Sequence, residues 1–335
     1  MLDLRVQVVA ATVADVSEPV PLPVAVAPRS ASWIDAAVEA GGGQLVAPER
    51  AEAIVGTRAN DPDGLAELLV THPHIGWVQL PWAGVDPYLR VMDADRSWTC
   101  AKGVYSEPVA EHALAMLLAG FRKLHTYSRA TSWTAQAGRN LLGAKVTIVG
   151  GGGIASSLIR MLGPFGTEIT VVRRTDAPMN DVARVLVSDG LHDGLRDADA
   201  VVLALPLLEE NRGLIGAREL ALLAPGAWLV NVARGAHVDH AALVASLDAG
   251  HLGGAALDVT DPEPLPDDHP LWSRPEVIIT PHTANTREMA RPLLGRRITE
   301  NVRRRRAGEQ LAGVVDLAAG YCQPERGRCE ARCLA

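Results

Sequence analysis

A strand, a glycine-rich turn and a helix follow one another near the middle of the chain, and this arrangement constrains the fold more than any other segment. The apolar run KVTIV leads directly into Gly150-x-Gly152-x-x-Ala155, which opens the helix-forming segment SSLIRML. The two glycines allow a tight turn and a close approach of backbone to a pyrophosphate, and the small third residue lets the helix pack on the strand. The pattern predicts a dinucleotide-binding unit whose turn is completed by Gly153 and Ile154. A plain glycine loop is the alternative.

The next strand candidate, EITVV, ends in Arg173, Arg174 and Thr175. A carboxylate at this position would hold the ribose 2′-hydroxyl of NAD and repel a 2′-phosphate. An arginine attracts the 2′-phosphate of NADP through a charge-assisted pair. We therefore predict that NADP(H) is favoured over NAD(H), with Arg173 as the main determinant. The alternative is a pair of exposed arginines at a strand end.

Apolar, strand-like runs alternate with helical stretches along the chain, which is typical of parallel sheets covered by helices. A length of 335 residues exceeds one ordinary core, so we expect two domains. The second half supplies seven strand candidates: KVTIVG, EITVV, ARVLV, DAVVLALP, AWLVNVA, GGAALDV and EVIITP. The first hundred residues supply RVQVVAATV, QLVA, EAIVG and GWVQL, and the Pro-rich stretch 19–28 is expected to be irregular. The predicted fold class is α/β, with two Rossmann-like or flavodoxin-like parallel-sheet domains.

Helices are predicted where apolar residues recur at helical spacing. SWIDAAVEA and PDGLAELLV lie in the first domain, a long apolar helix covers about 108–130, and a final helix covers about 286–306. Four consecutive arginines, Arg303 to Arg306, fall at the end of the final helix. We interpret them as a solvated helix end rather than a site for a polyanion.

Composition excludes several classes of partner. The net charge of −7 provides no field that attracts nucleic acid or an anionic membrane. No apolar run reaches the roughly 18 residues needed to span a bilayer, and the start MLDLRVQ does not resemble a signal peptide. Cys322, Cys329 and Cys333 match no common zinc spacing, so we predict no metal site. We also expect residues 322–335 to form a disordered tail and the protein to be cytoplasmic.

Three ionisable residues stand just beyond strand candidates of the second half. Arg234 follows AWLVNVA, Glu263 follows AALDVTDP, and His282 follows VIITP. Ligands bind at the carboxyl ends of strands in α/β sheets, where the loops open onto a crevice. A cation, a carboxylate and an imidazole in one crevice can anchor an anionic substrate and move a proton.

These blocks resemble the D-isomer-specific 2-hydroxyacid dehydrogenases from about Gln79 to Tyr321. The resemblance rests on AGVD at 83–86, VAEHALAMLLA at 109–119, VTIVGGGGIA at 146–155, ALPLLEENRGLIG at 204–216, LVNVARG at 229–235, GAALDVTDPEPLP at 254–266 and TPHTA at 280–284. The order and spacing of the blocks agree with the family. Glyoxylate/hydroxypyruvate reductases and 2-ketoacid reductases are the most similar members.

The resemblance implies a role for each of the three residues. Arg234 would bind the carboxylate and carbonyl oxygen of the substrate, which its planar fork suits. His282 would exchange a proton with the carbonyl oxygen. Glu263 would hold the other imidazole nitrogen, and its charge would favour the imidazolium form.

The resemblance also implies binding residues around this trio. Backbone N–H groups near Ala83 and Gly84 would bind the substrate carboxylate, and Trp82 would line the pocket. His112 is interpreted as structural. The remaining cofactor contacts that we expect are Leu205, Pro206, Val232, Ala233 and Asp258.

By resemblance, residues 1–103 and 286–321 form the substrate domain, and residues 104–285 form an inserted NAD(P)-binding Rossmann domain. The implied activity is the NADPH-dependent reduction of a small 2-oxo acid to the D-2-hydroxy acid by a homodimer. Two alternatives stay open. One is an NAD-linked phosphoglycerate, formate or phosphite dehydrogenase, and the other is a non-enzymatic, dinucleotide-sensing module related to corepressors.

Overall fold

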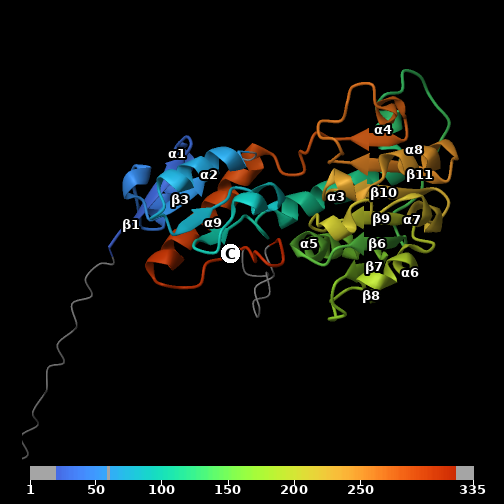
Figure 1. The fold of residues 1–335 in the computed structure, drawn as a ribbon. Helices are drawn as coiled ribbons and strands as arrows, with labels where there is room; N and C mark the ends of the chain where they lie inside the picture. The colour runs from blue at the N-terminus through green and yellow to red at the C-terminus, as the bar shows by residue number, and fades with distance from the viewer. Residues whose placement is uncertain (1–19, 59–60, 322–335) are drawn as a thin grey trace, which may run out of the picture.

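Two parallel sheets organise the protein in a computed structural model that describes residues 20–58 and 61–321 (Figure 1). The first sheet has the order β2-β1-β3-β4-β5, which is the flavodoxin-like arrangement. Its strands are β1 (Leu22–Ala27), β2 (Gly43–Leu45), β3 (Ala53–Gly56), β4 (Trp77–Gln79) and β5 (Ser97–Thr99). This finding confirms the predicted parallel α/β character of the first domain.

The second sheet has the order β12-β11-β10-β9-β6-β7-β8 and is parallel throughout. Its strands are β6 (Lys145–Val149), β7 (Glu168–Arg173), β8 (Arg184–Val187), β9 (Ala200–Leu203), β10 (Ala227–Asn231), β11 (Leu252–Leu257) and β12 (Val277–Ile279). All seven predicted strands are present. The order reverses between β6 and β9, and this switch point is where doubly wound sheets bind dinucleotides.

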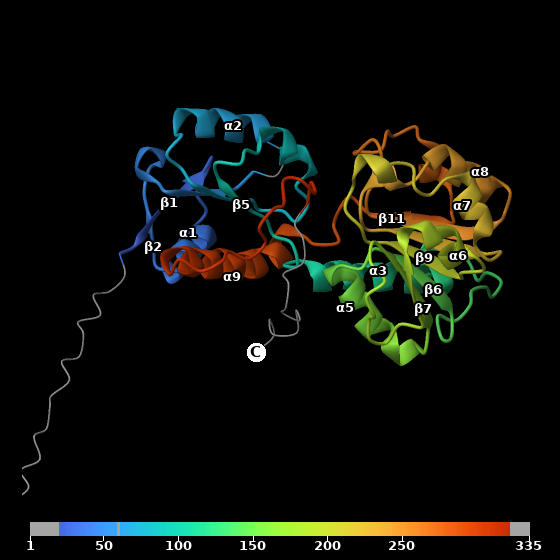
Figure 2. The ribbon, with the colours of Figure 1, turned by 60° about the horizontal axis from the view of Figure 1, so that its bottom comes forward.

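Helices cover both sheets and connect the two domains (Figure 2). They are α1 (Ser32–Ala40), α2 (Pro62–Thr71), α3 (Ser106–Phe121), α4 (Leu124–Tyr127), α5 (Gly153–Leu162), α6 (Leu191–Leu195), α7 (Ala217–Leu222), α8 (His240–Asp248) and α9 (Arg287–Arg306). Helix α3 runs from the first domain and packs beside α5 on the second sheet. Helix α9 returns to the first domain, where its apolar face shares a core with β1 and α1. In the described part of the chain, no helix is long and apolar enough to cross a membrane.

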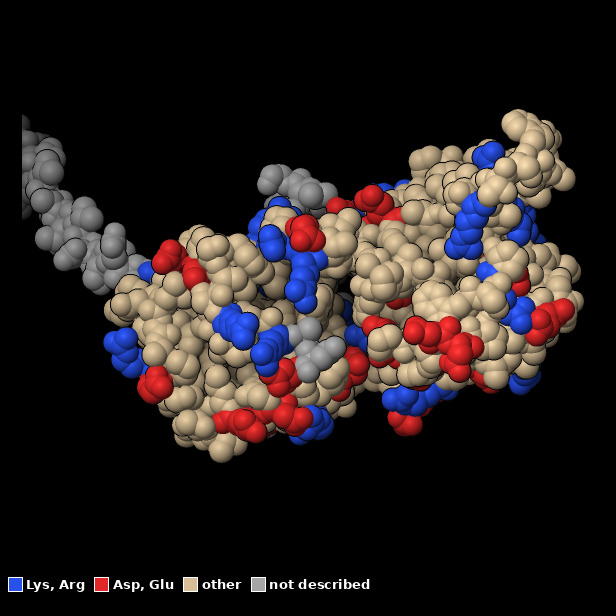
Figure 3. All heavy atoms as spheres, turned by 90° about the horizontal axis from the view of Figure 1, so that it is seen from above, with Lys and Arg blue, Asp and Glu red and all other residues tan. Residues whose placement is uncertain are grey.

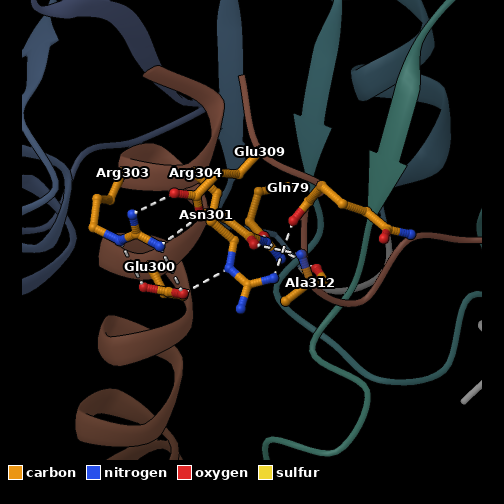
Figure 4. Close-up of polar contacts among 8 residues, drawn as sticks. Gln79, Glu300, Asn301, Arg303, Arg304, Glu309 and Ala312 are labelled. Carbon is orange, nitrogen blue, oxygen red and sulfur yellow. Dashed lines mark hydrogen bonds and ion pairs between the residues drawn. The ribbon is translucent and has the colours of Figure 1, made fainter. Parts of the chain in front are cut away.

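A buried polar network ties α9 to the first sheet (Figure 4). The Asn301 amide donates to Gln79 Oε1 at 2.8 Å and to the carbonyl of Ala312 at 2.9 Å, and its oxygen accepts from the N–H of Ala312. Thr99 donates to the same Gln79 oxygen. These three side chains are fully buried, so each needs the partners that the network gives it.

The arginine run forms the last turn of α9, as predicted. Arg303 bridges Glu300 and Glu309, and Arg304 also contacts Glu300 (Figure 4). On the face drawn in Figure 3, acidic and basic side chains lie interspersed. Arg303 and Arg304, two of the four arginines, therefore have neighbouring carboxylates as ion-pair partners.

Two predictions about local structure are wrong. The stretch 19–28, expected to be irregular, contains β1, because the apolar run after Pro23 alternates into two cores and pairs on both sides. The single helix expected at 108–130 ends at Phe121, because Lys123 adopts a left-handed conformation (φ 54°) and its Nζ donates to the carbonyl of Gly253. The predicted strand RVQVVAATV and the tail 322–335 lie outside the described residues.

Candidate active site

Arg234, Glu263 and His282 lie beyond the carboxyl ends of three adjacent strands, β10, β11 and β12. His282 Nδ1 is 2.8 Å from Glu263 Oε1, so the structure brings these two side chains together. The turn that begins at Arg234 packs closely against the loop that leads to Glu263. A Cβ added at Gly235 would overlap the backbone of Thr260 in that loop. The predicted trio therefore occupies one edge of the second sheet.

Arg234 extends from the second domain to the first. Its Nη2 lies 3.2 Å from Asp86 Oδ1, and its Nη1 donates to the carbonyl of Ala233 at 2.8 Å. The guanidinium lies so close to Gly84 that a Cβ there would overlap Nη2. Arg234 and the AGVD loop, which includes Ala83, thus meet across the two domains. Asp86 was not predicted as a site residue, although it is the last residue of that motif.

Two residues that were not predicted as site residues, Asn231 and His237, support the backbone of the turn at Arg234. Asn231 accepts from the N–H of Ala233 at 3.0 Å and donates to the carbonyl of Arg234 at 2.9 Å. His237 is fully buried, and its Nδ1 lies 3.0 Å from that same carbonyl. Burial, more than any other cause, lowers the pKa of His237, so the ring stays neutral and acts as a hydrogen-bonding support.

Asp258, the residue directly after β11, organises the loop that carries His282. Its buried carboxylate accepts from the N–H groups of Thr283 at 2.8 Å and Ala284 at 3.1 Å, and from the hydroxyl of Thr280 at 2.6 Å. Burial acts to raise the pKa of Asp258, but hydrogen bonds from His112, Thr280 and the two amides outweigh it, and the pKa is lowered. The residue therefore carries a negative charge beneath the His282 loop.

The glycine turn connects β6 to α5 at the switch point of the second sheet. Gly150 has φ +116°, and a Cβ there would overlap the carbonyl of Ala204 at the end of β9. Ala155 is fully buried in the core between α5 and the sheet. No atom lies within 4 Å of the Cβ position at Gly152, so the space before the amino end of α5 is open. Gly153 and Ile154 form the first turn of that helix, whose free N–H groups suit a pyrophosphate.

The two arginines after the glycine turn differ in their surroundings. Arg173 ends β7, and its side chain lies along Gly151, because a Cβ on Gly151 would meet the Arg173 Cδ at 2.8 Å. Arg174 instead stacks on the ring of Tyr321, with 4.6 Å between its Cζ and the ring centroid. Thr175 is exposed. Among the described residues, neither arginine forms an ion pair with an acidic side chain.

The other predicted contacts lie at the same sheet edge or beside it. Leu205 and Pro206 follow β9, next to the glycine turn, and Val232 and Ala233 follow β10. Trp82 sits against the ring of Tyr105, and its indole N–H is buried without a partner among the described residues. The side-chain oxygen and nitrogen of Asn285, three residues beyond His282, are also buried without a hydrogen-bond partner among the described residues.

The arrangement combines a cation, an imidazole oriented by a carboxylate, and a turn suited to phosphates. Such a site can bind an anionic substrate, polarise its carbonyl and exchange a proton with it. Within residues 20–58 and 61–321, no cluster of three or more histidines, cysteines or carboxylates is suited to a metal ion.

Comparison with known proteins identifies relatives of the chain. Residues 112–284 match the family model described as "D-isomer specific 2-hydroxyacid dehydrogenase, NAD binding domain". A glyoxylate/hydroxypyruvate reductase A from Photorhabdus laumondii is 32% identical over 216 residues, which cover 63% of this chain and 68% of that protein. A D-3-phosphoglycerate dehydrogenase from Mycobacterium tuberculosis is 31% identical over 296 residues, covering 84% of this chain and 54% of the relative.

Among solved structures, a D-isomer specific 2-hydroxyacid dehydrogenase from Xanthobacter autotrophicus in complex with NADPH and MES superposes with a TM-score of 0.77. It is 30% identical in sequence, and the match covers 90% of this chain and 99% of that one. The similarity therefore extends over both domains.

Proposed function

The chain belongs to the family of D-isomer specific 2-hydroxyacid dehydrogenases, and from this premise we propose that it reduces a small 2-oxo acid with NADPH. The protein is an NAD(P)-dependent oxidoreductase. Glyoxylate and hydroxypyruvate are the first substrates to consider, because a relative that carries their name matches much of the chain. The observation that supports the proposal most directly is the 2.8 Å contact between His282 and Glu263, at the same end of the sheet as Arg234.

In this proposal, Arg234 binds and orients the 2-oxo acid. Its permanent charge pairs with the substrate carboxylate and polarises the carbonyl that accepts the hydride. The N–H groups around Ala83 and Gly84 supply further donors from the facing domain, and Trp82 borders the pocket. Closure of the two domains over the substrate would exclude water from the site.

His282 is the proposed proton donor to the carbonyl oxygen. With Nδ1 hydrogen-bonded to Glu263, the other ring nitrogen is available to the substrate, and the carboxylate stabilises the charged ring. The nicotinamide cofactor supplies the hydride when it is bound. The reaction therefore needs one proton from His282 for each turnover, and the ring is recharged from solvent.

The open turn at Gly150–Ala155 fits the pyrophosphate, and Arg173 is the proposed partner of a 2′-phosphate. Its side chain lies along the turn and has no acidic partner in the described structure, whereas Arg174 is stacked on Tyr321. Leu205, Pro206, Val232, Ala233 and Asp258 would border the rest of the cofactor. The NADPH complex of the relative from Xanthobacter autotrophicus supports the preference for NADP(H).

Phosphoglycerate oxidation is the second candidate, because the mycobacterial phosphoglycerate dehydrogenase is a relative of similar identity. This chain spans about half the length of that enzyme. The domain boundaries at 104 and 286, the homodimer and the cytoplasmic location stay as predictions.

An assay of NADPH and NADH oxidation with a panel of 2-oxo acids tests the proposal, with 3-phosphoglycerate and NAD or NADP as the reverse test. We expect turnover with glyoxylate or hydroxypyruvate and NADPH. The variant His282→Gln should lose turnover and keep NADPH binding, measured by fluorescence titration. Absence of turnover with every 2-oxo acid would refute the reductase function, and oxidation of 3-phosphoglycerate alone would favour the second candidate.

A further inference from the structure

His112, on α3, reaches the loop that carries His282, although the two residues are far apart in sequence. Its Nε2 lies 3.1 Å from the Thr280 hydroxyl and 3.5 Å from Asp258 Oδ1. His112 is partly buried, and the Asp258 carboxylate is almost fully buried. The contact joins the long helix between the domains to the ends of β11 and β12.

The direction of these hydrogen bonds fixes the role of His112. The Thr280 hydroxyl has one proton, and it donates this proton to Asp258 Oδ1 at 2.6 Å. The hydroxyl oxygen of Thr280 must then accept a hydrogen bond from His112, so the Nε2 atom of His112 carries a proton. A chain of donors therefore runs from His112 through Thr280 to the carboxylate of Asp258.

Asp258 also forms hydrogen bonds with the backbone of His282 and of the residues that follow it. Its carboxylate accepts from Thr283 and Ala284, and its carbonyl accepts from the N–H of His282 at 2.9 Å. His282 has φ 52°, a left-handed conformation that is strained for a non-glycine residue. Such a conformation persists only when its surroundings hold it, and here the holding groups are those that His112 contacts.

We propose that His112 is a positioning residue: through Thr280 and Asp258, it keeps His282 in the left-handed conformation that directs the imidazole toward Glu263. This inference rests on the proposed role of His282 as proton donor. His112 itself touches none of the reacting atoms. Because His112 projects from α3, the position of the proposed proton donor depends on this helix.

Two substitutions separate this role from ordinary packing. His112→Leu removes the donor and keeps the bulk, whereas His112→Gln keeps a side-chain N–H that can reach Thr280. The matched control is His125→Leu, at a buried histidine of α4 whose Nδ1 lies 3.2 Å from the carbonyl of Ala119. Among the described residues, His125 makes no hydrogen bond or ion pair with the loop that carries His282.

Hydrogen–deuterium exchange of residues 278–286 gives a readout that does not require turnover. We expect His112→Leu to speed the exchange of this segment by about tenfold, and His112→Gln and His125→Leu to leave it near the wild-type rate. In the reductase assay, His112→Leu should lower kcat by about tenfold with a smaller change in KM, and His112→Gln should recover most of the loss.

Exchange and kcat in His112→Leu that match those of His125→Leu would overturn the inference, as would a Gln variant that behaves like the Leu variant. If the wild-type protein turns over no 2-oxo acid, the proposed function fails, while the exchange measurement still decides whether His112 holds the loop.

Discussion

The imidazole of His282 and the carboxylate of Glu263 form a direct 2.8 Å contact through Nδ1 and Oε1. Both side chains are about half exposed, at 51% and 44%, so the pair faces the solvent rather than a core. The described part of the chain makes no other hydrogen bond or ion pair to the His282 side chain, so Nε2 is available to a ligand. An accessible ring nitrogen of this kind is what the proposed proton transfer requires.

Replacing Glu263 with glutamine should keep a hydrogen-bond acceptor for Nδ1 and remove the negative charge. The ring of His282 then loses its anionic partner while the contact is kept, so kcat for reduction should fall by roughly tenfold. The measurement is kcat for glyoxylate reduction near neutral pH. Glu219→Gln is a matched control, because Glu219 makes a 2.8 Å contact with His192 elsewhere on the second domain. An equal kcat for the two variants would contradict the role of Glu263.

The cofactor preference should depend on Arg173. Loss of a charge-assisted hydrogen bond to the 2′-phosphate costs about 1.5–3 kcal/mol, so Arg173→Ala should raise the KM for NADPH by roughly 10- to 100-fold and change the KM for NADH little. Arg184→Ala, at the start of the edge strand β8, serves as the control for a general loss of positive charge. An Arg173→Ala enzyme that keeps its NADPH preference would exclude Arg173 as the determinant.

The close approach of Gly84 to Arg234 predicts that even a methyl group is harmful there. In Gly84→Ala the Cβ would overlap Nη2, so the guanidinium must move away from Asp86. We expect kcat/KM to fall by about 30-fold or more, because small displacements of a positioning group are costly, while the melting temperature changes little. Gly163→Ala is the control, since no atom lies within 4 Å of its Cβ position. Equal activity of the two variants would show that Arg234 tolerates displacement.

The apolar runs and the glycine turn predicted most of the second domain. Strands β6, β7, β9, β10 and β11 are buried along most of their length, so each reads as a nearly continuous apolar run. The first domain was harder to predict. Strand β5 is the three-residue segment Ser97–Thr99 and has no apolar run, and prolines obscured β1. Local pattern therefore identified the strands with a clear apolar run, whereas β1 and β5 are defined by their pairing in the sheet.

The sequence predicted those site residues that follow the ends of apolar strands. Arg234, Glu263 and His282 could be placed because parallel strands bring their carboxyl ends to one edge. Asp86 and His112 could not, because their partners lie 148 and 168 residues away in sequence, and no spacing rule relates them. Their contacts depend on how two domains and a connecting helix pack, which only the assembled structure reveals.

A buried histidine outside the trio makes stability depend on pH. His240, the first residue of α8, is 8% exposed, packs against the ring of His269 at 5.8 Å, and has no hydrogen-bond partner for either ring nitrogen among the described residues. Burial, and then the neighbouring His269, lower the pKa of His240 below its usual value of 6.5, although Asp261 and Asp239 oppose the shift. The folded protein therefore takes up this proton less readily than the unfolded chain does.

The free energy of unfolding should consequently fall as the pH drops through 6.5, with a slope that approaches about 1.4 kcal/mol per pH unit for this group. Above that pH both states are neutral at His240, and its contribution to the slope vanishes. His240→Leu should remove this part of the slope and leave stability near pH 7.5 unchanged or higher, because it replaces two unsatisfied buried nitrogens with apolar atoms. Urea unfolding between about pH 5 and 7.5 measures the effect, with His74→Leu as the control at an exposed ring. Parallel stability curves for His240→Leu and the wild-type protein would show that His240 is protonated equally in both states.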